Sequence, residues 1–302
     1  MAFSPHKKRV AVLRGGASPE YEASLVTGKF VLENMPEEFE AVDVFVSRDG
    51  VWHQGGFEMS PHKILLGVDA VWNCLHGGTG ENGGVQRLVA DFGLPQAGSP
   101  HLSSALSMNK ALAKNIFTRS GLKTPIALTI NKDEDLQKMF ERVYRSMPFP
   151  IVIKPVDAGS SLGISIANSH REVKDAVDKA FAISPNALIE EYIEGKEVVG
   201  GIIEGFRGEA YYPLLPISSF SISPQESEQV TEVARLAHIA LGLEDFSESN
   251  LVVHPRRGVY ILEVNTLPKL NAESAFIKSI QSAGSDIKEF ISHTLHRILG
   301  KK

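Results

Sequence analysis

A lysine ends an apolar stretch of the chain in the segment IVIKPVDAGSSLG, residues 151–163, and a loop of small residues follows it. Residues 151–153 are all β-branched, which favours a strand that is covered on both faces. Lys154 therefore comes at the point where this strand leaves the core. The Gly-Ser-Ser loop at residues 159–161 lies beside that cation and can wrap around an anion. The segment indicates an anion-binding site.

Polar side chains interrupt a second apolar stretch, ILEVNTLPK at residues 261–269. Glu263 and Asn265 are two residues apart and so lie on one face of the predicted strand. Burying an unpaired carboxylate is costly, so Glu263 requires a cation, either an arginine or a metal ion. Carboxylate and amide oxygens suit Mg²⁺ that also bridges substrate phosphates, and Asn250 on the neighbouring predicted strand adds a third oxygen. An ordinary buried salt bridge is the alternative.

The segment GGASPEYEASL, residues 15–25, follows the first predicted strand and begins a helix. Ser18 can cap this helix, Pro19 suits its first turn, and Glu20 lies where the helix dipole favours an anion. The segment is then either a stable helix start and nothing more, or a site where the carboxylate of Glu20 binds the amine of an amino acid.

The segment ALIEEYIEGKE, residues 187–197, places Glu190 and Glu197 around a predicted strand. The backbone of residues 191–193 can offer the donor and acceptor groups that the edge of an adenine base requires. Acidic residues at strand ends are mostly solvated, so this segment alone is a weak indication of a nucleotide site.

The glycine-rich segment HGGTGENGG, residues 76–84, contains the Gly-x-Gly-x-x-Gly spacing of dinucleotide-binding folds. That fingerprint also requires an acidic residue about 20 positions later for the ribose. Residues 92–129 contain neither Asp nor Glu, so a nicotinamide-dependent dehydrogenase is disfavoured. The chain also lacks G-x-x-x-x-G-K-[ST], so phosphates must be held in another way.

Composition limits the class of protein. The 302 residues, 22% charged and 43% hydrophobic, suit a soluble globular chain of two or three subdomains. The net charge of −5 comes without a basic block, which disfavours nucleic acid as a partner.

The single cysteine, Cys74, excludes an internal disulfide and suits a reducing compartment. No apolar run approaches the roughly 20 residues of a membrane span, and the run before Arg14 is too short for a secretory signal. We expect a cytoplasmic protein.

The elements that must position these residues begin with an alternation of extended and helical patterns, which predicts a parallel sheet covered by helices. The predicted strands and helices of the first hundred residues are Val10–Leu13, Ala41–Val46 and Val68–Leu75, and Glu22–Leu32 and Gly84–Phe92. The segment GLPQAGSPHLSS, rich in Gly, Pro and Ser, marks a boundary near residue 100.

A helix over 102–120 and further α/β alternation follow, with strands at PIALTI, IVIKP and GISIA. Residues 187–218 read as three consecutive strands separated by Glu-Gly turns, which predicts antiparallel pairing. The SPQE sequence at residues 223–226 is a capping box that begins a helix over 224–241. Two strands joined by a PRRG turn and two helices complete the chain.

The chain resembles the D-alanine–D-alanine ligases, members of the ATP-grasp superfamily, in seven segments that keep their order and spacing: GGASPEYEAS, CLHGGTGENGGVQ, GLPQAGS, SALSMNK, IVIKPVDAGSSLG, LIEEYIEGKE and ILEVNTLP. The resemblance implies an ATP-grasp fold of α/β plus α+β class, in which two α+β subdomains clamp ATP after a parallel α/β domain. It implies a substrate domain over 1–100, a central ATP-grasp subdomain over 101–187 and a C-terminal one over 188–302.

The resemblance also implies which residues bind the nucleotide and its metal ion. The residues implied for ATP are Lys110, Lys154, Gly159, Ser160, Ser161, Glu190, Glu191, Ile193 and Glu197. Of these, the two lysines contact phosphates and the Gly-Ser-Ser loop closes over them. Glu190 and the backbone at residues 191 and 193 bind adenine, and Glu197 binds the ribose. Mg²⁺, or Mn²⁺ in its place, is expected at Asn250, Glu263 and Asn265.

For the amino-acid substrates, the resemblance implies that Glu20 meets the ammonium of the first amino acid and that His76 lies near its carboxylate. Ser274 contacts the second amino acid. The residues expected to act in catalysis are Glu20, Ser160 and Lys269.

The chain departs from the family pattern on the side of the second substrate. The family has an arginine and, two residues on, a metal-binding aspartate, where this chain has Glu248 and Asn250. The family's long loop with a Tyr and a Lys has no equivalent in YPLLPISSFSISPQ, and Lys269 stands where a glycine follows NT-x-P. We expect either Lys269 or Arg257 to substitute for the missing arginine.

The implied activity is an ATP-dependent ligation of two D-alanines through an acyl phosphate, for peptidoglycan synthesis. The implied partners are small molecules, ATP and D-alanine, with no nucleic acid or membrane, and the family suggests a homodimer. Two alternatives remain open at this point. One is an ATP-grasp ligase with a different amino acid or amine as acceptor, and the other is a nucleotide-binding homologue with little ligase activity.

Overall fold

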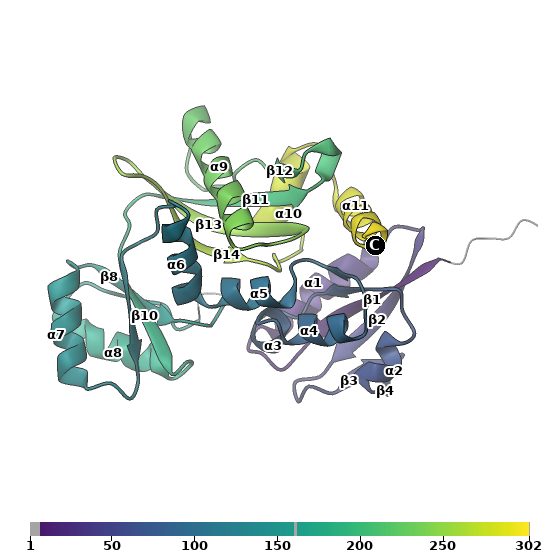
Figure 1. The fold of residues 1–302 in the computed structure, drawn as a ribbon, viewed down its shortest axis with the longest axis horizontal. Helices are drawn as coiled ribbons and strands as arrows, with labels where there is room; N and C mark the ends of the chain where they lie inside the picture. Colours follow the sequence, from purple (N-terminus) through teal and green to yellow (C-terminus); the bar gives the residue numbers. More distant parts are fainter. Residues whose placement is uncertain (1–6, 160–161, 302) are drawn as a thin grey trace, which may run out of the picture.

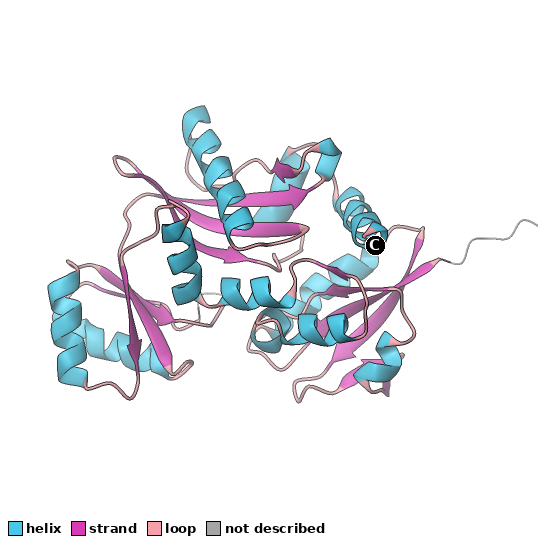
Figure 2. Ribbon diagram, in the orientation of Figure 1, coloured by secondary structure: helices cyan, strands magenta, loops and turns pink. Residues whose placement is uncertain are grey.

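A computed structural model describes residues 7–159 and 162–301, which form three sheets with helices packed on them (Figure 1, Figure 2). The first sheet has the order β4-β3-β2-β1-β5-β6. Its strands are β1 (Lys8–Gly15), β2 (Phe39–Val46), β3 (Trp52–Gln54), β4 (Phe57–Glu58), β5 (Ala70–Asn73) and β6 (Gln96–Ala97). The helices of this region are α1 (Tyr21–Glu33), α2 (Pro61–Leu65), α3 (Gly78–Glu81) and α4 (Gly84–Asp91).

The parallel, covered sheet expected from the first hundred residues is confirmed for β1, β2, β5 and β6, whereas β3 and β4 add an antiparallel edge that was not predicted. β1 pairs in parallel with β2 and β5, and β5 pairs in parallel with β6. The central residues of β1, Val10–Leu13, are completely buried, because both faces of this strand are covered. The expected cap at Ser18 takes another form. The Ser18 hydroxyl accepts from the backbone N–H of Glu20 and donates to the carbonyl of His76, which ties the start of α1 to the loop after β5.

The second sheet is antiparallel, with the order β7-β10-β8-β9. Its strands are β7 (Ala127–Asn131), β8 (Ile151–Pro155), β9 (Ser165–Ala167) and β10 (Asn186–Glu191). Helices α7 (Leu136–Ser146) and α8 (His170–Phe181) cover one face, where Met139 and Val173 pack against Ile151 and Ile153. Lys154 and Val152 are on the opposite face, because side chains alternate along a strand.

The third sheet is also antiparallel, with the order β12-β11-β13-β14. Its strands are β11 (Lys196–Glu204), β12 (Tyr211–Pro213), β13 (Phe246–His254) and β14 (Gly258–Asn265). The helices around it are α9 (Pro224–Ala240), α10 (Ala275–Ser282) and α11 (Ile287–Gly300), with the short 3-10 turn η1 (Phe206–Gly208) before β12. The capping box predicted at residues 223–226 is confirmed at the start of α9.

The pairing predicted within residues 187–218 is wrong for its first strand. β10 pairs with β7 and β8 of the second sheet, and only β11 and β12 pair with each other. The Glu-Gly step at residues 194–195 is thus a crossing between sheets and not a hairpin. The expected boundary at 187/188 falls within β10.

The single helix predicted over 102–120 is two helices, α5 (His101–Met108) and α6 (Lys110–Arg119). Asn109 separates them in an extended conformation, and its side chain accepts from the backbone N–H of Leu112 as the cap of α6. This break makes Lys110 the first residue of α6, where its own N–H donates to the carbonyl of Val156 after β8.

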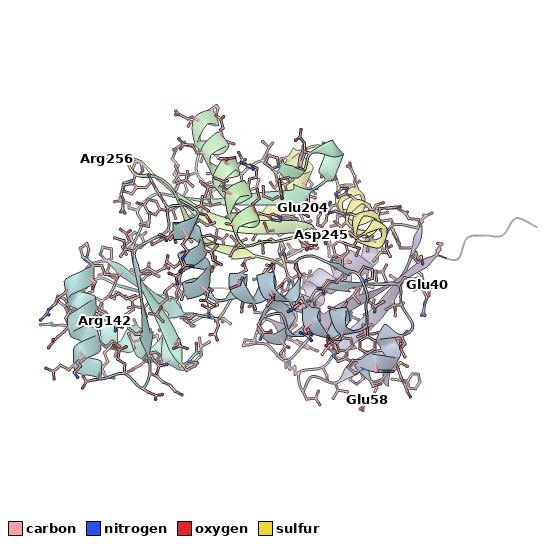
Figure 3. All side chains as sticks on the ribbon, viewed as in Figure 1. Glu40, Glu58, Arg142, Glu204, Asp245 and Arg256 are labelled. Atoms are coloured by element: carbon pink, nitrogen blue, oxygen red, sulfur yellow. The ribbon has the colours of Figure 1, made fainter. Side chains whose placement is uncertain are left out.

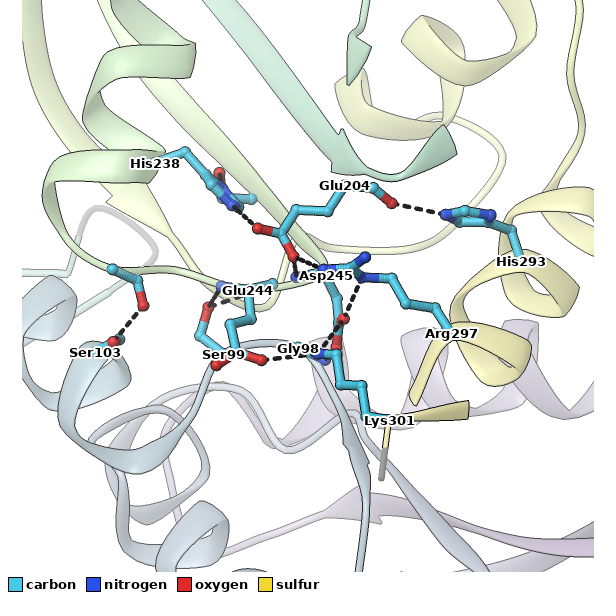
Figure 4. A network of polar contacts seen from close by, with 12 residues as sticks. Gly98, Ser99, Ser103, Glu204, His238, Glu244, Asp245, His293, Arg297 and Lys301 are labelled. Carbon is cyan, nitrogen blue, oxygen red and sulfur yellow. Dashed lines mark hydrogen bonds and ion pairs between the residues drawn. The ribbon is translucent and has the colours of Figure 1, made fainter. Parts of the chain in front are cut away.

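Aromatic packing joins the first and third sheets into one core. Trp72 of β5 stacks on Phe246 of β13, and both contact Phe290 of α11. A network of charged side chains lies beside this core, with Glu204 and Asp245 at its centre (Figure 3, Figure 4). Arg297 bridges the two carboxylates, and the backbone N–H of Gly98 donates to Asp245 over 3.0 Å. The ends of the first and third sheets are therefore fixed relative to each other.

Candidate active site

Two cavities are lined by residues expected from the sequence to bind the nucleotide and the amino acids. The larger, about 560 Å³, lies between the second and third sheets and has mostly apolar walls. Its apolar lining includes Val152, Ile164, Ile166, Tyr192, Ile193, Val199, Val252 and Leu262. The residues expected to bind adenine and ribose, residues 190–197, line one side of this cleft. Of the expected nucleotide residues, Lys154 also lines this cleft, whereas Lys110 and Gly159 do not. Ser160 and Ser161 lie outside the described residues.

A carboxylate flanked by two lysines forms the polar end of this cleft. Lys154 Nζ lies 2.8 Å from one oxygen of Glu190, and Lys114 Nζ lies 2.8 Å from the other. All three side chains are buried. Burial lowers the pKa of Lys114 to about 8, although the Glu190 charge opposes this shift. Glu190 thus aligns two ammonium groups. Removing its carboxylate would leave the charges of both buried lysines unpaired.

Sequence reasoning missed Lys114. It lies four residues after Lys110, which places both lysines on one face of α6. That spacing was the available signal in the sequence. Its meaning depends on a contact between α6 and β10, which the structure shows as the pair of Lys114 and Glu190. The adenine role expected for Glu190 stays a prediction, since its carboxylate contacts the two lysines.

A second lysine–carboxylate pair stands beside the first. Lys110 Nζ is 3.3 Å from Glu263 and also donates to the carbonyl of Ala158. The amide of Asn250 donates to the other oxygen of Glu263 over 3.0 Å. Burial alone would raise the pKa of Glu263, but the charges of Lys110 and Lys154 outweigh it, so the pKa of this carboxyl is lowered. Glu263 is therefore held in its charged form beside these lysines.

The pairing of β13 with β14 explains why these groups face the cleft. Asn250 pairs with Glu263 and Glu248 with Asn265, and the register shifts between Asn250 and Leu251. An irregularity of this kind re-aims the side chains next to it. Here it lets Leu262 and Glu263 line the same cleft although they are adjacent in sequence.

The second cavity, about 400 Å³, is a polar chamber between the third sheet, the first sheet and the start of α10. Its lining includes Glu20, His76, Glu81, Gly159, Glu248, Asn250, Glu263, Asn265, Lys269, Glu273 and Ser274. Asn250 and Glu263 line both cavities, so the chamber meets the apolar cleft at these two side chains. Three expected substrate residues, Glu20, His76 and Ser274, are thus brought together.

Buried contacts hold the substrate residues of this chamber in place. The His76 ring nitrogen Nε2 is 2.9 Å from the Thr27 hydroxyl, and its Nδ1 is 3.7 Å from Glu81. The Ser274 hydroxyl caps α10 by accepting from the N–H of Ile277. A Cβ atom at Gly159 would stand 2.6 Å from a carboxylate oxygen of Glu20. A side chain at position 159 would therefore displace the carboxylate of Glu20.

Glu248 also faces the chamber, where its carboxylate accepts from the amide of Asn265 over 3.4 Å. Burial raises its pKa, against the opposing effects of Asn265 and of the Lys269 charge. Arg257, expected as a substitute for the family arginine, is elsewhere. It forms two 3.0 Å contacts with Glu191 and lies over the Tyr260 ring, so it does not reach the chamber. The expected role of Lys269, which does line the chamber, stays a prediction.

The chemistry of the donors at the junction fits a hard cation. Within residues 7–159 and 162–301, His, Cys, Asp and Glu side chains form no group of three or more that could hold a metal by themselves. Glu263, Asn250 and Asn265 nevertheless present carboxylate and amide oxygens to one space. This donor set suits Mg²⁺, which is usually held by one or two carboxylates together with substrate phosphates.

The fold and the site together define a class of protein. A parallel α/β domain precedes two antiparallel subdomains, and a cleft lined with buried lysines and a carboxylate lies between them. This is the ATP-grasp arrangement. In the described part of the chain, none of the helices is long and apolar enough to span a membrane.

Comparisons with known proteins narrow this class to a family. A sequence profile for the D-ala D-ala ligase C-terminus matches residues 116–213 and 216–296. D-alanine–D-alanine ligases from Citrifermentans bemidjiense and Gloeobacter violaceus are 32% and 31% identical to this chain. Each alignment covers 96% of this chain, and they cover 95% and 99% of the relatives. The chain belongs to the D-alanine–D-alanine ligase family.

Solved structures agree with this assignment. The D-alanine–D-alanine ligase from Bacillus anthracis, complexed with ATP, has a TM-score of 0.81 at 26% identity, covering 98% of this chain and 99% of that one. A D-Ala:D-Ser ligase from Enterococcus faecalis shares the fold with a TM-score of 0.85 at 24% identity, covering 96% and 99%.

Proposed function

We propose that this protein joins two D-alanine molecules in an ATP-dependent reaction that passes through an acyl phosphate and supplies peptidoglycan synthesis. One observation carries the proposal: Glu263 and Asn250 line both the apolar cleft and the polar chamber, and Lys110 and Lys154 stand at the same junction. A triphosphate whose adenine occupies the cleft would reach the chamber at this point.

The reaction proposed has two steps. A carboxylate oxygen of the first D-alanine attacks the γ phosphorus of ATP, the bond to ADP breaks, and an acyl phosphate forms. The amine of the second D-alanine then attacks the acyl carbon, phosphate leaves, and the amine loses a proton. The contribution of the protein is mainly positioning and electrostatic stabilisation of charge on the transferring group.

We assign the residues as follows. Lys110 and Lys154 bind the phosphates, because both are buried lysines whose charges act on Glu263, where the cleft meets the chamber. The backbone at residues 191 and 193 binds adenine, and Glu197 binds the ribose. Glu20 binds the ammonium of the first D-alanine, and His76 lies near its carboxylate. Lys269 and Ser274 lie on the side of the second substrate.

Glu263, Asn250 and Asn265 would hold a divalent cation, Mg²⁺ or Mn²⁺ in its place, which would neutralise charge on the phosphates. We further propose that the protein works as a homodimer in the cytoplasm. We also propose three structural units, 1–100, 101–187 and 188–302, with the whole of β10 kept in the second unit because it pairs with β7 and β8. The shared core of the first and third sheets supports a close association of the outer two units.

The test is an incubation of the full chain with ATP, Mg²⁺ and a panel of D- and L-amino acids, with phosphate release and dipeptide followed by mass spectrometry. We expect D-alanyl-D-alanine and one phosphate for each dipeptide. A dipeptide made only from other amino acids would contradict the substrate assignment, and ATP binding without turnover on any amino acid would contradict ligase activity.

A further inference from the structure

Four side chains that line the chamber form a rectangle, and two of them, Asn250 and Glu263, also line the cleft. Glu248 and Asn250 alternate on one face of β13, and they stand opposite Asn265 and Glu263 of β14. Each asparagine amide donates to the glutamate across from it, over 3.0 Å to Glu263 and 3.4 Å to Glu248. With their N–H groups used in this way, both asparagines keep their carbonyl oxygens for another partner.

The two carboxylates of this rectangle differ in how their charge is balanced. Glu263 has Lys110 at 3.3 Å. Glu248 forms no ion pair within 4 Å among residues 7–159 and 162–301. It accepts a hydrogen bond from the amide of Asn265, and the Lys269 charge acts on it from farther away. A partly buried carboxylate next to a second carboxylate is unfavourable unless a cation joins them. The position of Glu248 therefore calls for a positive charge between it and Glu263.

The three residues assigned to the cation above carry only one negative charge between them. Glu263 is the only carboxylate among the three residues assigned to the cation above, because Asn250 and Asn265 are neutral. Glu248 is two residues before Asn250 on the same strand face, and it lines the same chamber. Residues diagonal to each other across an antiparallel pair have Cβ atoms about 7 Å apart or less, which long side chains can bridge.

We propose that Glu248 is a ligand of the divalent cation and supplies the second carboxylate of its site. The cation is held between Glu248 and Glu263, with the amide oxygens of Asn250 and Asn265 and the nucleotide phosphates completing an all-oxygen set of the kind that Mg²⁺ and Mn²⁺ prefer. This inference rests on the proposed function, since it uses the phosphates of the bound nucleotide.

The test is the affinity for Mn²⁺, measured from the electron paramagnetic resonance of free Mn²⁺ in titrations of the full chain with a non-hydrolysable ATP analogue. We expect Glu248→Gln to weaken Mn²⁺ binding by about tenfold or more, because ligand charge sets the affinity of such oxygen sites. The control is Glu273→Gln. It removes the same charge from the rim of the same chamber, where Glu273 is 86% exposed and paired with Lys278, and it should leave the affinity unchanged.

A rescue variant separates ligation from a general effect on stability. Glu248→Gln combined with Asn250→Asp moves the carboxylate two residues along the same face, and we expect it to restore most of the Mn²⁺ affinity. Unchanged Mn²⁺ binding in Glu248→Gln would overturn the proposal, as would an equal loss in Glu273→Gln or no Mn²⁺ binding by the unmodified protein.

The dipeptide assay distinguishes a failure of the inference about Glu248 from a failure of the proposed reaction. If the unmodified protein makes D-alanyl-D-alanine and Glu248→Gln binds Mn²⁺ normally, only the inference about Glu248 fails. If the unmodified protein makes no dipeptide and Glu248→Gln still loses Mn²⁺, the metal assignment stands and the proposed reaction fails.

Discussion

Glu190 is the residue around which the polar end of the cleft is organised. Its two oxygens each hold one buried lysine at 2.8 Å, so one carboxylate aligns both ammonium groups. The sequence identified Lys154 and Glu263 because a charged residue in an apolar strand stands out by itself. It did not identify Lys114, because the role of that lysine depends on α6 facing β10 across the fold.

Replacing Lys154 tests the phosphate assignment. We expect Lys154→Ala to raise the KM for ATP by roughly 10- to 100-fold, since it removes a charge-assisted contact, while Glu190 keeps its bond to Lys114. The control is Lys174→Ala, an exposed lysine of α8 in the same subdomain that pairs with Asp178. Steady-state kinetics at saturating D-alanine would measure both. Equal ATP dependence in the two variants would rule out phosphate binding by Lys154.

Replacing Glu263 tests the cation assignment. Glu263→Ala should abolish dipeptide formation, because it removes the carboxylate shared by the cleft and the chamber and leaves Lys110 without its partner. Binding of the ATP analogue without metal should persist, which a fluorescence titration would show. Normal turnover in this variant would remove Glu263 from the site.

At the scale of elements, a single asparagine positions the start of α6. Asn109 ends α5 and caps α6, so Lys110 meets Glu263 from the first turn of the helix. The segment SALSMNKALAK contains no Gly or Pro, and its helical pattern continues through the break, so the sequence predicted one helix. The prediction from sequence also placed β10 in the wrong sheet, for a related reason. A local Glu-Gly turn indicates that the chain changes direction, but it does not indicate which sheet the strand joins.

A matched pair of cap variants tests this role. Asn109→Ala and Ser223→Ala each remove a side-chain cap, of α6 and α9 respectively, so each should lower the free energy of unfolding by about 1 kcal/mol. Only Asn109→Ala should also raise the KM for ATP, since only α6 carries Lys110. Chemical denaturation and kinetics would measure the two effects. A similar KM in both variants would show that the break serves stability alone.

At the scale of the whole molecule, the polar network of Figure 4 fixes the substrate side of the site to the cation side. Asp245 accepts from Gly98 of the first domain and pairs with Arg297 and Lys301 near the end of the chain. Gly98 and Asp245 are 147 positions apart, and Asp245 is 52 and 56 positions from Arg297 and Lys301, so no local pattern in the sequence predicts these contacts. The packing of Trp72 on Phe246 was unpredictable for the same reason.

This network predicts how stability depends on pH. Burial alone would raise the pKa of Glu204, but hydrogen bonds from His238 and the Asp245 backbone, with the Arg297 charge, lower it to about 2. A lowered carboxyl pKa stabilises the fold above the unfolded value of 4.5, and this contribution is lost as the pH falls toward 2. The pKa of Asp245 is instead raised by burial, so its contribution has the opposite sign.

Comparing the stability of variants separates the contribution of Glu204 from that of the other titratable groups. We expect Glu204→Gln to be less stable than the unmodified protein by about 3 kcal/mol near pH 7, with the difference shrinking between pH 5 and pH 2. Urea denaturation at several pH values would measure this, with Glu58→Gln at an exposed position of β4 (Figure 3) as the control. A difference that stays constant down to pH 2 would contradict the lowered pKa of Glu204.

The central claim is that two lysines and one carboxylate meet on a single triphosphate at the junction of the two cavities. A crystal structure with a non-hydrolysable ATP analogue and Mn²⁺ tests it most directly, because the anomalous signal of manganese locates the cation. We predict adenine in the cleft lined by Ile193, phosphates within hydrogen-bond distance of Lys110 and Lys154, and manganese on Glu263. A triphosphate bound away from these three side chains would contradict the account.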